Sequence, residues 1–316
     1  MNASRLLTPV LALFFLCSPS AAGATKKRPA PTRPVPKKKT APAVRSAPAV
    51  EDGEMALAAR GAMLIEALSG KSLYEKNADT RFYPASTTKI MTGLLVIEAG
   101  GLDTLVEVTE EDARVGESSL SIRPGQAYTR RQMLYGLMLK SANDVAHALG
   151  RDNGGTVEDF ALKMTQRAQE LGCTNTSFMN AHGLHHPGHY TSPRDLALIA
   201  RAAMNQPLFR QIVATQQAAW AAPTGTFMLS NHNRLLQRFP GCNGVKTGYT
   251  IPAQQVLASS AARGGREAIA VVMHTDKPGI WEDSAKLLEF GLKQDLPRTL
   301  GPAEIQPETA PPGVVR

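Results

Sequence analysis

The chain is poor in cysteine, in acidic residues near its start and in long apolar runs, and each shortage excludes something. Its 316 residues include three cysteines, at positions 17, 173 and 242, and no Cys-x-x-Cys pair that would indicate a zinc or redox site. No Asp or Glu occurs before residue 51. The apolar run near the N-terminus, residues 6–17, is too short to span a bilayer. We therefore expect neither a cysteine-based metal site nor a membrane span at this run.

The N-terminal residues have the order of a secretory signal peptide. Arg5 precedes the apolar run, and Ala22-Gly23-Ala24 offers the small residues of a cleavage site. We expect residues 1–24 to be removed and the protein to be exported, to the periplasm or to the extracellular cell-wall space. Cleavage leaves Cys173 and Cys242, and the sequence does not decide whether they pair.

Residues 25–50 are predicted to be a basic, proline-rich linker. They contain six prolines, eight Lys or Arg and no acidic residue, which favours an extended polyproline-type tether. Residues 1–50 hold 9 of the 35 basic side chains and none of the 27 acidic ones, so 26 and 27 remain from Glu51 onward, a net charge of −1. The linker suits weak contact with anionic envelope polymers, or it is a solvated spacer. An exported chain is not expected to bind nucleic acid.

A serine and a lysine three residues apart form the first of three motifs. Ser86-Thr87-Thr88-Lys89 precedes an apolar segment, residues 90–97, that suits a buried helix ended by Gly100-Gly101. Ser86 is then at a helix N-terminus, where its own backbone N–H is free to help hold an oxyanion. Lys89, one turn on, places its amine beside the Ser86 hydroxyl, and loss of hydration favours a neutral amine that can act as a base. In isolation, the same spacing usually means a capping serine and a surface lysine.

The second motif, Ser141-Ala142-Asn143, separates two helical patterns. Residues 128–140 are apolar at helical spacing and residues 145–149 are apolar again, so the motif is expected in a loop between helices. Such a loop can direct Ser141 into a cleft as a proton relay and Asn143 as a partner for a substrate amide. Alone, the motif is equally well a helix break with a capping residue.

The third motif, Lys246-Thr247-Gly248, begins a predicted β region. Three antiparallel strands are expected near residues 245–250, 255–261 and 268–273, with turn residues between them. Lys246 and Gly248 share a strand face, so Gly248 leaves room for a substrate backbone to pair with the strand edge. Lys246 supplies positive charge, and Thr247 can donate to a terminal carboxylate.

In this order the three motifs resemble those of low-molecular-mass penicillin-binding proteins of the serine-type D-alanyl-D-alanine carboxypeptidase family, within the DD-peptidase and β-lactamase superfamily. Asn180-Ala181-His182-Gly183-Leu184 and residues 190–197 fit the family as well. The resemblance spans residues 55–293. It implies removal of the terminal D-Ala from peptidoglycan stem peptides and inhibition by β-lactam antibiotics such as penicillin.

The resemblance also implies a role for each motif residue. Ser86 attacks the peptide carbonyl, Lys89 takes its proton, and Ser141 completes the proton network with Lys246. The backbone N–H groups of Ser86 and Tyr249 form the oxyanion hole. The implied substrate-binding residues are Asn143, Lys246, Thr247, Gly248 and Tyr249. No cofactor is implied.

Two positions depart from the family pattern. Ala253-Gln254-Gln255 follows the third motif where relatives usually have an Ala-Gly pair, which alters the acceptor side of the site. Gly279-Ile280-Trp281 stands where many relatives carry an arginine, so the group that holds the substrate carboxylate is left open. Histidines 182, 185, 186 and 189 crowd a Gly/Pro loop, a setting that does not favour a metal site.

The expected fold is mixed α/β: an antiparallel five-stranded sheet flanked by helices, plus an all-helical lobe, with the site between them. A hairpin within residues 55–74 joins the three C-terminal strands, and residues 281–292 form a closing helix. Four segments are predicted: a signal peptide (1–24), a linker (25–50), a catalytic domain (51–293) and a Pro-rich tail (294–316) without a membrane-binding helix.

Three other functions are weighed against a carboxypeptidase. A DD-endopeptidase, which cuts peptidoglycan cross-links, would use the same residues. A β-lactamase of this fold needs a further general base, in a Glu-x-x-Leu-Asn loop that residues 170–175 do not match. A non-catalytic peptidoglycan-binding protein would not be expected to keep Ser86, Lys89 and Lys246 intact.

Overall fold

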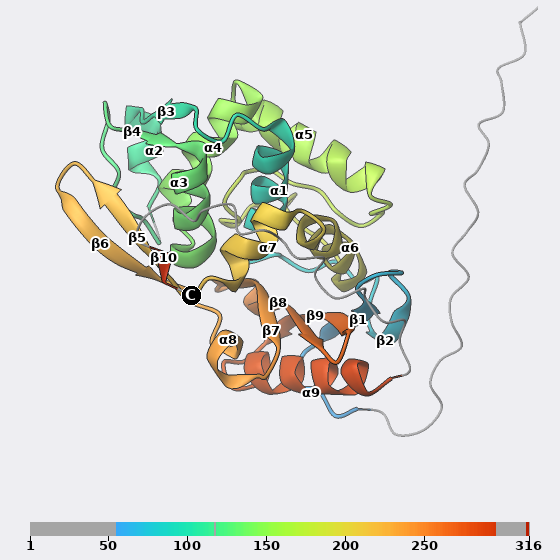
Figure 1. Ribbon diagram of the computed structural model, residues 1–316. Coiled ribbons are helices and arrows are strands. Elements are labelled where there is room, and N and C mark those ends of the chain that lie inside the picture. The colour runs from blue at the N-terminus through green and yellow to red at the C-terminus, as the bar shows by residue number, and fades with distance from the viewer. Residues whose placement is uncertain (1–54, 117, 295–313, 316) are drawn as a thin grey trace, which may run out of the picture. The chain divides into compact units, whose positions relative to one another are not determined.

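Segments from opposite ends of the sequence form one antiparallel sheet in the computed structural model (Figure 1). Its strand order is β2-β1-β9-β8-β7. The strands are β1 (Gly61–Glu66), β2 (Ser72–Lys76), β7 (Cys242–Thr250), β8 (Gln254–Arg263) and β9 (Arg266–Thr275). The predicted five-stranded sheet is confirmed, and so is the pairing of the N-terminal hairpin with the C-terminal strands, through β1 and β9.

The structure describes residues 55–116, 118–294 and 314–315. The predicted signal peptide (1–24) and linker (25–50) lie outside these residues, as does nearly all of the predicted tail. Within the described ranges, no helix is both long enough and apolar enough to cross a membrane.

The sheet is buried on both faces because its strands alternate between two apolar clusters. Ala62 and Leu64 of β1 pack toward α9 (Gly279–Lys293), whereas Met63 and Ile65 join the larger core. Figure 1 shows α9 on one side of the sheet and the other long helices on the opposite side. The predicted closing helix is thus confirmed, and it begins two residues earlier than expected.

The larger core surrounds α1 (Lys89–Ala99), whose first eight residues are all buried. Helices α4, α5, α6 and α7 pack around it. They span Asn143–Gly154, Val157–Glu170, Pro193–Met204 and Pro207–Ala214. As predicted, α1 ends at Gly100. The helix α6 begins at Pro193, and the Ser192 side chain caps it by accepting from the Asp195 N–H.

The helical region also contains short strands, so its description as all-helical is incomplete. Tyr128, expected in a helix, lies in β4 (Ala127–Thr129), which pairs with β3 (Leu105–Glu107). The helix α3 (Arg130–Tyr135) starts later because the Thr129 side chain caps it by accepting from the Gln132 N–H. A short helix, α2 (Glu110–Arg114), follows β3.

A second β-structure, β5 (Gln217–Ala222) with β6 (Gly225–Ser230), was not expected from the sequence. Trp220 of β5 is buried and packs on Tyr128, with ring centroids 4.9 Å apart. The two-residue strand β10 (Val314–Val315) pairs with the outer edge of β5. A short helix, α8 (Leu235–Arg238), then leads from β6 toward β7.

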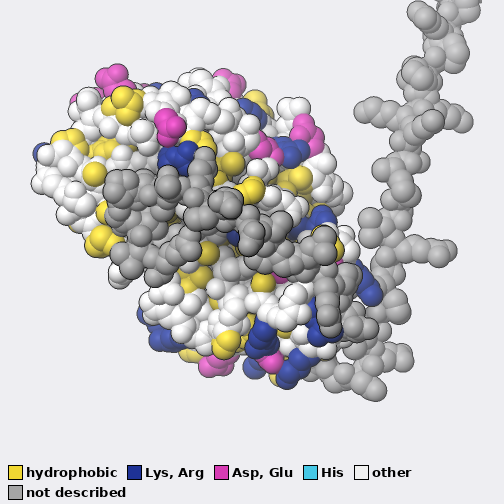
Figure 2. Space-filling model, viewed as in Figure 1, with side chains coloured by type: hydrophobic (Ala, Val, Ile, Leu, Met, Phe, Trp, Pro, Cys, Tyr) yellow, Lys and Arg dark blue, Asp and Glu magenta, His cyan; other side chains and the backbone are white. Residues whose placement is uncertain are grey.

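The surface of the described residues carries charges of both signs. Figure 2 shows Lys, Arg, Asp and Glu side chains interspersed over the visible face, with Lys and Arg most frequent along its lower edge. This mixture agrees with the near-zero net charge of the sequence from Glu51 onward. Cys173 is buried and Cys242 is half-buried, and they are not paired with each other, which answers the question that the sequence left open.

Candidate active site

Ser86 lies in a single 3-10 turn, Ala85–Thr88, that leads directly into α1. Lys89 is the first residue of α1 and is fully buried. Its Nζ lies 3.1 Å from the Ser86 Oγ, the contact that their spacing of three residues predicts. The chain therefore brings a hydroxyl and a buried amine within hydrogen-bond distance.

Two oxygen atoms from distant parts of the sequence hold the Lys89 amine. Its Nζ donates to the Asn143 side-chain oxygen and to the His182 backbone carbonyl, both at 2.6 Å. A neutral amine has two N–H groups, and these two acceptors use both of them. Its lone pair is then left for the third neighbour, the Ser86 hydroxyl.

Burial lowers the pKa of the Lys89 amine well below its usual value, and the nearby charge of Lys246 lowers it further. Burial also lowers the pKa of Lys246, to about 7. The environment thus favours the neutral form of Lys89 that the geometry requires of a base.

The segment 180–184 supplies a contact that the sequence reasoning missed, the carbonyl of His182. Gly183 lets this segment approach the nucleophile turn, because a Cβ at this position would lie 1.9 Å from the Ala85 carbonyl oxygen. Gly183 also has a φ of 90°, which glycine adopts without strain. The likeness of residues 180–184 to the family was a signal for this segment, but no residue type reveals which backbone carbonyl will accept a hydrogen bond.

Two of the four clustered histidines, His182 and His189, are buried, whereas His185 and His186 are exposed. The His189 Nδ1 accepts from the Met179 N–H at 3.0 Å, so its Nε2 carries the proton and donates to the Thr88 Oγ1 at 2.8 Å. Burial lowers the pKa of both His182 and His189 to about 3, so both rings are neutral. His189 therefore has a structural role: its hydrogen bond to Thr88 fixes the turn that carries Ser86.

Ser141 and Asn143 flank the break between a π-helical turn, Gly136–Lys140, and α4, close to the predicted loop. Ser141 has a left-handed conformation, with a φ of 65°, and its side chain lines the same cavity as Ser86. The Asn143 amide contacts Lys89 and donates to the Gly116 carbonyl at 3.1 Å. Its predicted contact with a substrate amide stays a prediction.

The strand β7 brings the third motif against the nucleophile turn. A Cβ on Gly248 would lie 2.9 Å from the Ser86 backbone nitrogen, so the strand and the turn are in direct contact. Lys246 is 2 % exposed, and its Nζ donates to the Thr247 carbonyl at 3.0 Å. Within the described residues, no hydrogen bond joins Lys246 to Ser86 or Ser141, so the predicted proton network is not closed here.

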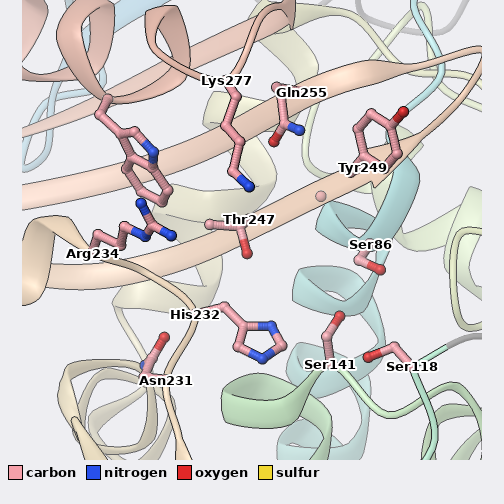
Figure 3. A pocket seen from close by; sticks show the side chains of 12 residues that line it. Ser86, Ser118, Ser141, Asn231, His232, Arg234, Thr247, Tyr249, Gln255 and Lys277 are labelled. Carbon is pink, nitrogen blue, oxygen red and sulfur yellow. The ribbon is translucent and has the colours of Figure 1, made fainter.

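A cavity of about 460 Å³ opens between the nucleophile turn and β7 (Figure 3). Five predicted residues line it, whereas Lys89, Asn143 and Lys246 lie behind its wall. The five are Ser86, Ser141, Thr247, Gly248 and Tyr249. The lining residues that were not predicted as site residues are Ser118, Asn231, His232, Arg234, Gln255, Lys277 and Trp281.

Both departures from the family pattern fall at this cavity. Gln254 has a φ of 55°, a conformation that the glycine of relatives would adopt at no steric cost, and Gln255 lines the cavity. Trp281 lines it as well. The acceptor side of the site therefore has different side chains from the expected family pattern.

Comparison with known proteins agrees with the resemblance. The family model described as D-alanyl-D-alanine carboxypeptidase matches residues 46–277. The chain is 39 % identical over 262 residues to the D-alanyl-D-alanine carboxypeptidase DacF of Bacillus subtilis, covering 79 % of this chain and 67 % of the relative. It is 34 % identical over 239 residues to a D-alanyl-D-alanine carboxypeptidase of Mycobacterium tuberculosis, covering 74 % of this chain and 82 % of the relative.

A solved structure supports the same grouping. The crystal structure of a Streptomyces DD-transpeptidase superposes with a TM-score of 0.73 at 34 % identity. The superposition covers 77 % of this chain and the whole of that structure.

The close contact at Gly248 generates a prediction. In Gly248→Ala, the added methyl group should push β7 away from the Ser86 backbone N–H. The rate at which a β-lactam acylates Ser86 should then fall about 100-fold, the effect of losing one oxyanion donor. Stopped-flow acylation kinetics measure the rate, and circular dichroism with thermal unfolding checks that the fold is kept. A folded variant that is acylated at the wild-type rate would show that the close approach of Gly248 to Ser86 does not affect acylation.

Proposed function

The chain belongs to the D-alanyl-D-alanine carboxypeptidase family of serine hydrolases, and we propose that it removes the terminal D-Ala of peptidoglycan stem peptides through an acyl-enzyme on Ser86. The observation that carries this proposal is the buried Lys89 amine, whose Nζ lies 3.1 Å from the Ser86 Oγ and is held by the Asn143 side-chain oxygen and the His182 carbonyl, both at 2.6 Å. A hydroxyl with a basic lone pair beside it is the arrangement of an activated nucleophile.

Acylation then proceeds in two steps. Lys89 accepts the Ser86 proton as the Oγ forms a bond to the carbonyl carbon of the penultimate D-Ala, and the backbone N–H groups of Ser86 and Tyr249 stabilise the oxyanion. The C–N bond breaks, and the leaving amine receives the proton that Lys89 took from Ser86, relayed through Ser141 and Lys246, so that Lys89 is neutral again. Free D-Ala departs, and the remainder of the peptide is esterified to Ser86.

Water completes the cycle. It attacks the ester carbonyl while Lys89 accepts one of its protons, and the proton returns to the Ser86 Oγ as the bond to the enzyme breaks. The shortened stem peptide leaves with a new carboxylate. Tyr249 is exposed, and within the described residues β7 is the last strand of its sheet, which supports an extended peptide lying along this strand.

The partners and location follow from the same proposal. Stem peptides are the substrates, and β-lactam antibiotics such as penicillin are inhibitors that acylate Ser86. We propose export to the periplasm or the cell-wall space. There the basic linker, residues 25–50, would make weak, salt-sensitive contacts with anionic envelope polymers.

Product analysis tests the proposed reaction. We expect D-Ala release from a stem pentapeptide to be faster, in kcat/KM, than cleavage of a D-Ala cross-linked dimer, because the Thr247 hydroxyl lines the cavity and suits a free terminal carboxylate. Mass spectrometry of the digested monomers and dimers measures both reactions, with the Ser86→Ala protein as the inactive control. Faster cleavage of the dimer would favour the alternative endopeptidase, and no cleavage of either would refute the proposal.

Substitutions of Lys89 test the base. In Lys89→Ala and Lys89→Arg, the rate of Ser86 acylation by penicillin should fall by about 100-fold or more, which is within the range of general-base contributions. Alanine accepts no proton, and arginine stays protonated. Intact-mass measurement with peptide mapping detects the adduct on Ser86. Arg238→Gln, on the exposed surface of α8, is a control that should acylate normally. Rapid acylation of Lys89→Arg would assign the base to another residue.

A further inference from the structure

We propose that Arg234 and Lys277 hold the free terminal carboxylate of the substrate in this chain. The inference rests on the proposed function and deepens it, because it assigns the group that the sequence left open at Gly279-Ile280-Trp281, where many members of the family carry an arginine. It concerns the end of the cavity beyond Thr247, away from Ser86 (Figure 3).

The charge of the cavity favours an anion. Among the described residues, its lining includes Arg234 and Lys277 but no Asp or Glu. Figure 3 shows the Lys277 ammonium and the Arg234 guanidinium extending from two sides toward Thr247, with Ser86 and Ser141 at the other end. A peptide with its scissile bond at Ser86 would thus direct its terminal carboxylate toward two cations and a hydroxyl.

Lys246 is badly placed to bind the carboxylate directly. It is 2 % exposed and lies behind the cavity wall, where its ammonium donates to the Thr247 carbonyl. A direct contact with a carboxylate would need a cation whose charge reaches the cavity. Arg234 and Lys277 are both exposed residues that line it.

No carboxylate among the described residues pairs with either cation. The side chains of Arg234 and Lys277 form no ion pair or hydrogen bond there, whereas Arg130, Arg167 and Arg194 each pair with carboxylates. An unpaired guanidinium beside a cavity keeps its fork of N–H donors for a ligand.

The backbone that carries Arg234 is firmly held. The preceding residue, Asn233, is buried, and its Nδ2 donates to the Gly244 carbonyl of β7 at 2.8 Å. Its Oδ1 accepts from the Leu235 N–H at 3.1 Å. These bonds fix the turn before α8 to the strand of the third motif, so Arg234 keeps its position relative to Thr247.

Trp281 supplies a surface for Arg234. The guanidinium carbon lies 5.9 Å from the centre of the indole ring, within the range of a cation–π interaction. Trp281 belongs to α9, and Lys277 lies in the turn between β9 and α9. Although the segment Gly279-Ile280-Trp281 contains no arginine, the cavity therefore has a cation beside Trp281, supplied by Arg234.

The test compares two substrates that differ only in their terminal charge. These are an N-acylated stem peptide ending in D-Ala-D-Ala and the same peptide with a C-terminal amide. The wild-type chain should prefer the carboxylate. Arg234→Gln and Lys277→Gln should each lower kcat/KM for the carboxylate peptide about tenfold, mainly through KM, since one charge-assisted hydrogen bond is lost. Their rates on the amide should change by less than about twofold.

Two further variants separate charge from structure. Arg234→Lys keeps the positive charge and should retain more of the carboxylate preference than Arg234→Gln. Arg238→Gln removes a charge four residues away, outside the cavity, and should behave as the wild type. Equilibrium binding of both peptides to the Ser86→Ala protein, with and without the two glutamine substitutions, gives a readout without turnover.

The outcomes distinguish failure of the carboxylate assignment from failure of the proposed function. Release of D-Ala by the wild type, with loss of carboxylate preference in both glutamine variants, supports the assignment. Release of D-Ala with the preference unchanged in both variants would overturn the roles of Arg234 and Lys277 alone. Failure of the wild type to release D-Ala would overturn the proposed function itself.

Discussion

The site depends on the pair of hydrogen bonds by which two oxygen atoms hold the buried Lys89 amine. Asn143 and the His182 carbonyl each accept one N–H at 2.6 Å, and the Ser86 hydroxyl occupies the remaining direction. A charged lysine in this position would lose most of its hydration without a carboxylate to pair with, so burial favours the neutral amine. The same desolvation that costs stability thus provides the base.

The contacts to the Lys89 amine depend on the whole fold, because the residues that make them come from different regions of the chain. The buried helix α1 carries Lys89, the helix break before α4 carries Asn143, and the close approach of Gly183 to Ala85 positions the His182 carbonyl. The sheet adds β7, whose Gly248 passes against the Ser86 backbone. A second buried lysine, Lys246, raises the electrostatic cost and lowers the pKa of Lys89 further. The hydrophobic core must offset this cost.

The sequence was sufficient for features that depend on local spacing or on strand and helix periodicity. The Ser86–Lys89 contact, the buried α1, the three C-terminal strands and α9 were all predicted. It was insufficient where a contact joins distant residues through backbone atoms, as at His182, or where the pattern is weak. The alanine-rich β5 was missed because only Trp220 gives it a strong apolar signal, and Arg234 was missed because its position near Thr247 depends on the fold of the turn before α8.

The central claim is that Lys89 is neutral when it meets the Ser86 hydroxyl, and a titration of that one amine tests it most directly. Nitrogen NMR of the lysine side chains in the full chain, with the Lys89 resonance assigned by its loss in Lys89→Arg, would follow its protonation. The account predicts that this amine titrates well below the ordinary lysine value of 10.5, and that removing the charge at position 246 moves its titration upward. A Lys89 amine that stays protonated up to pH 10.5 or above would contradict the account.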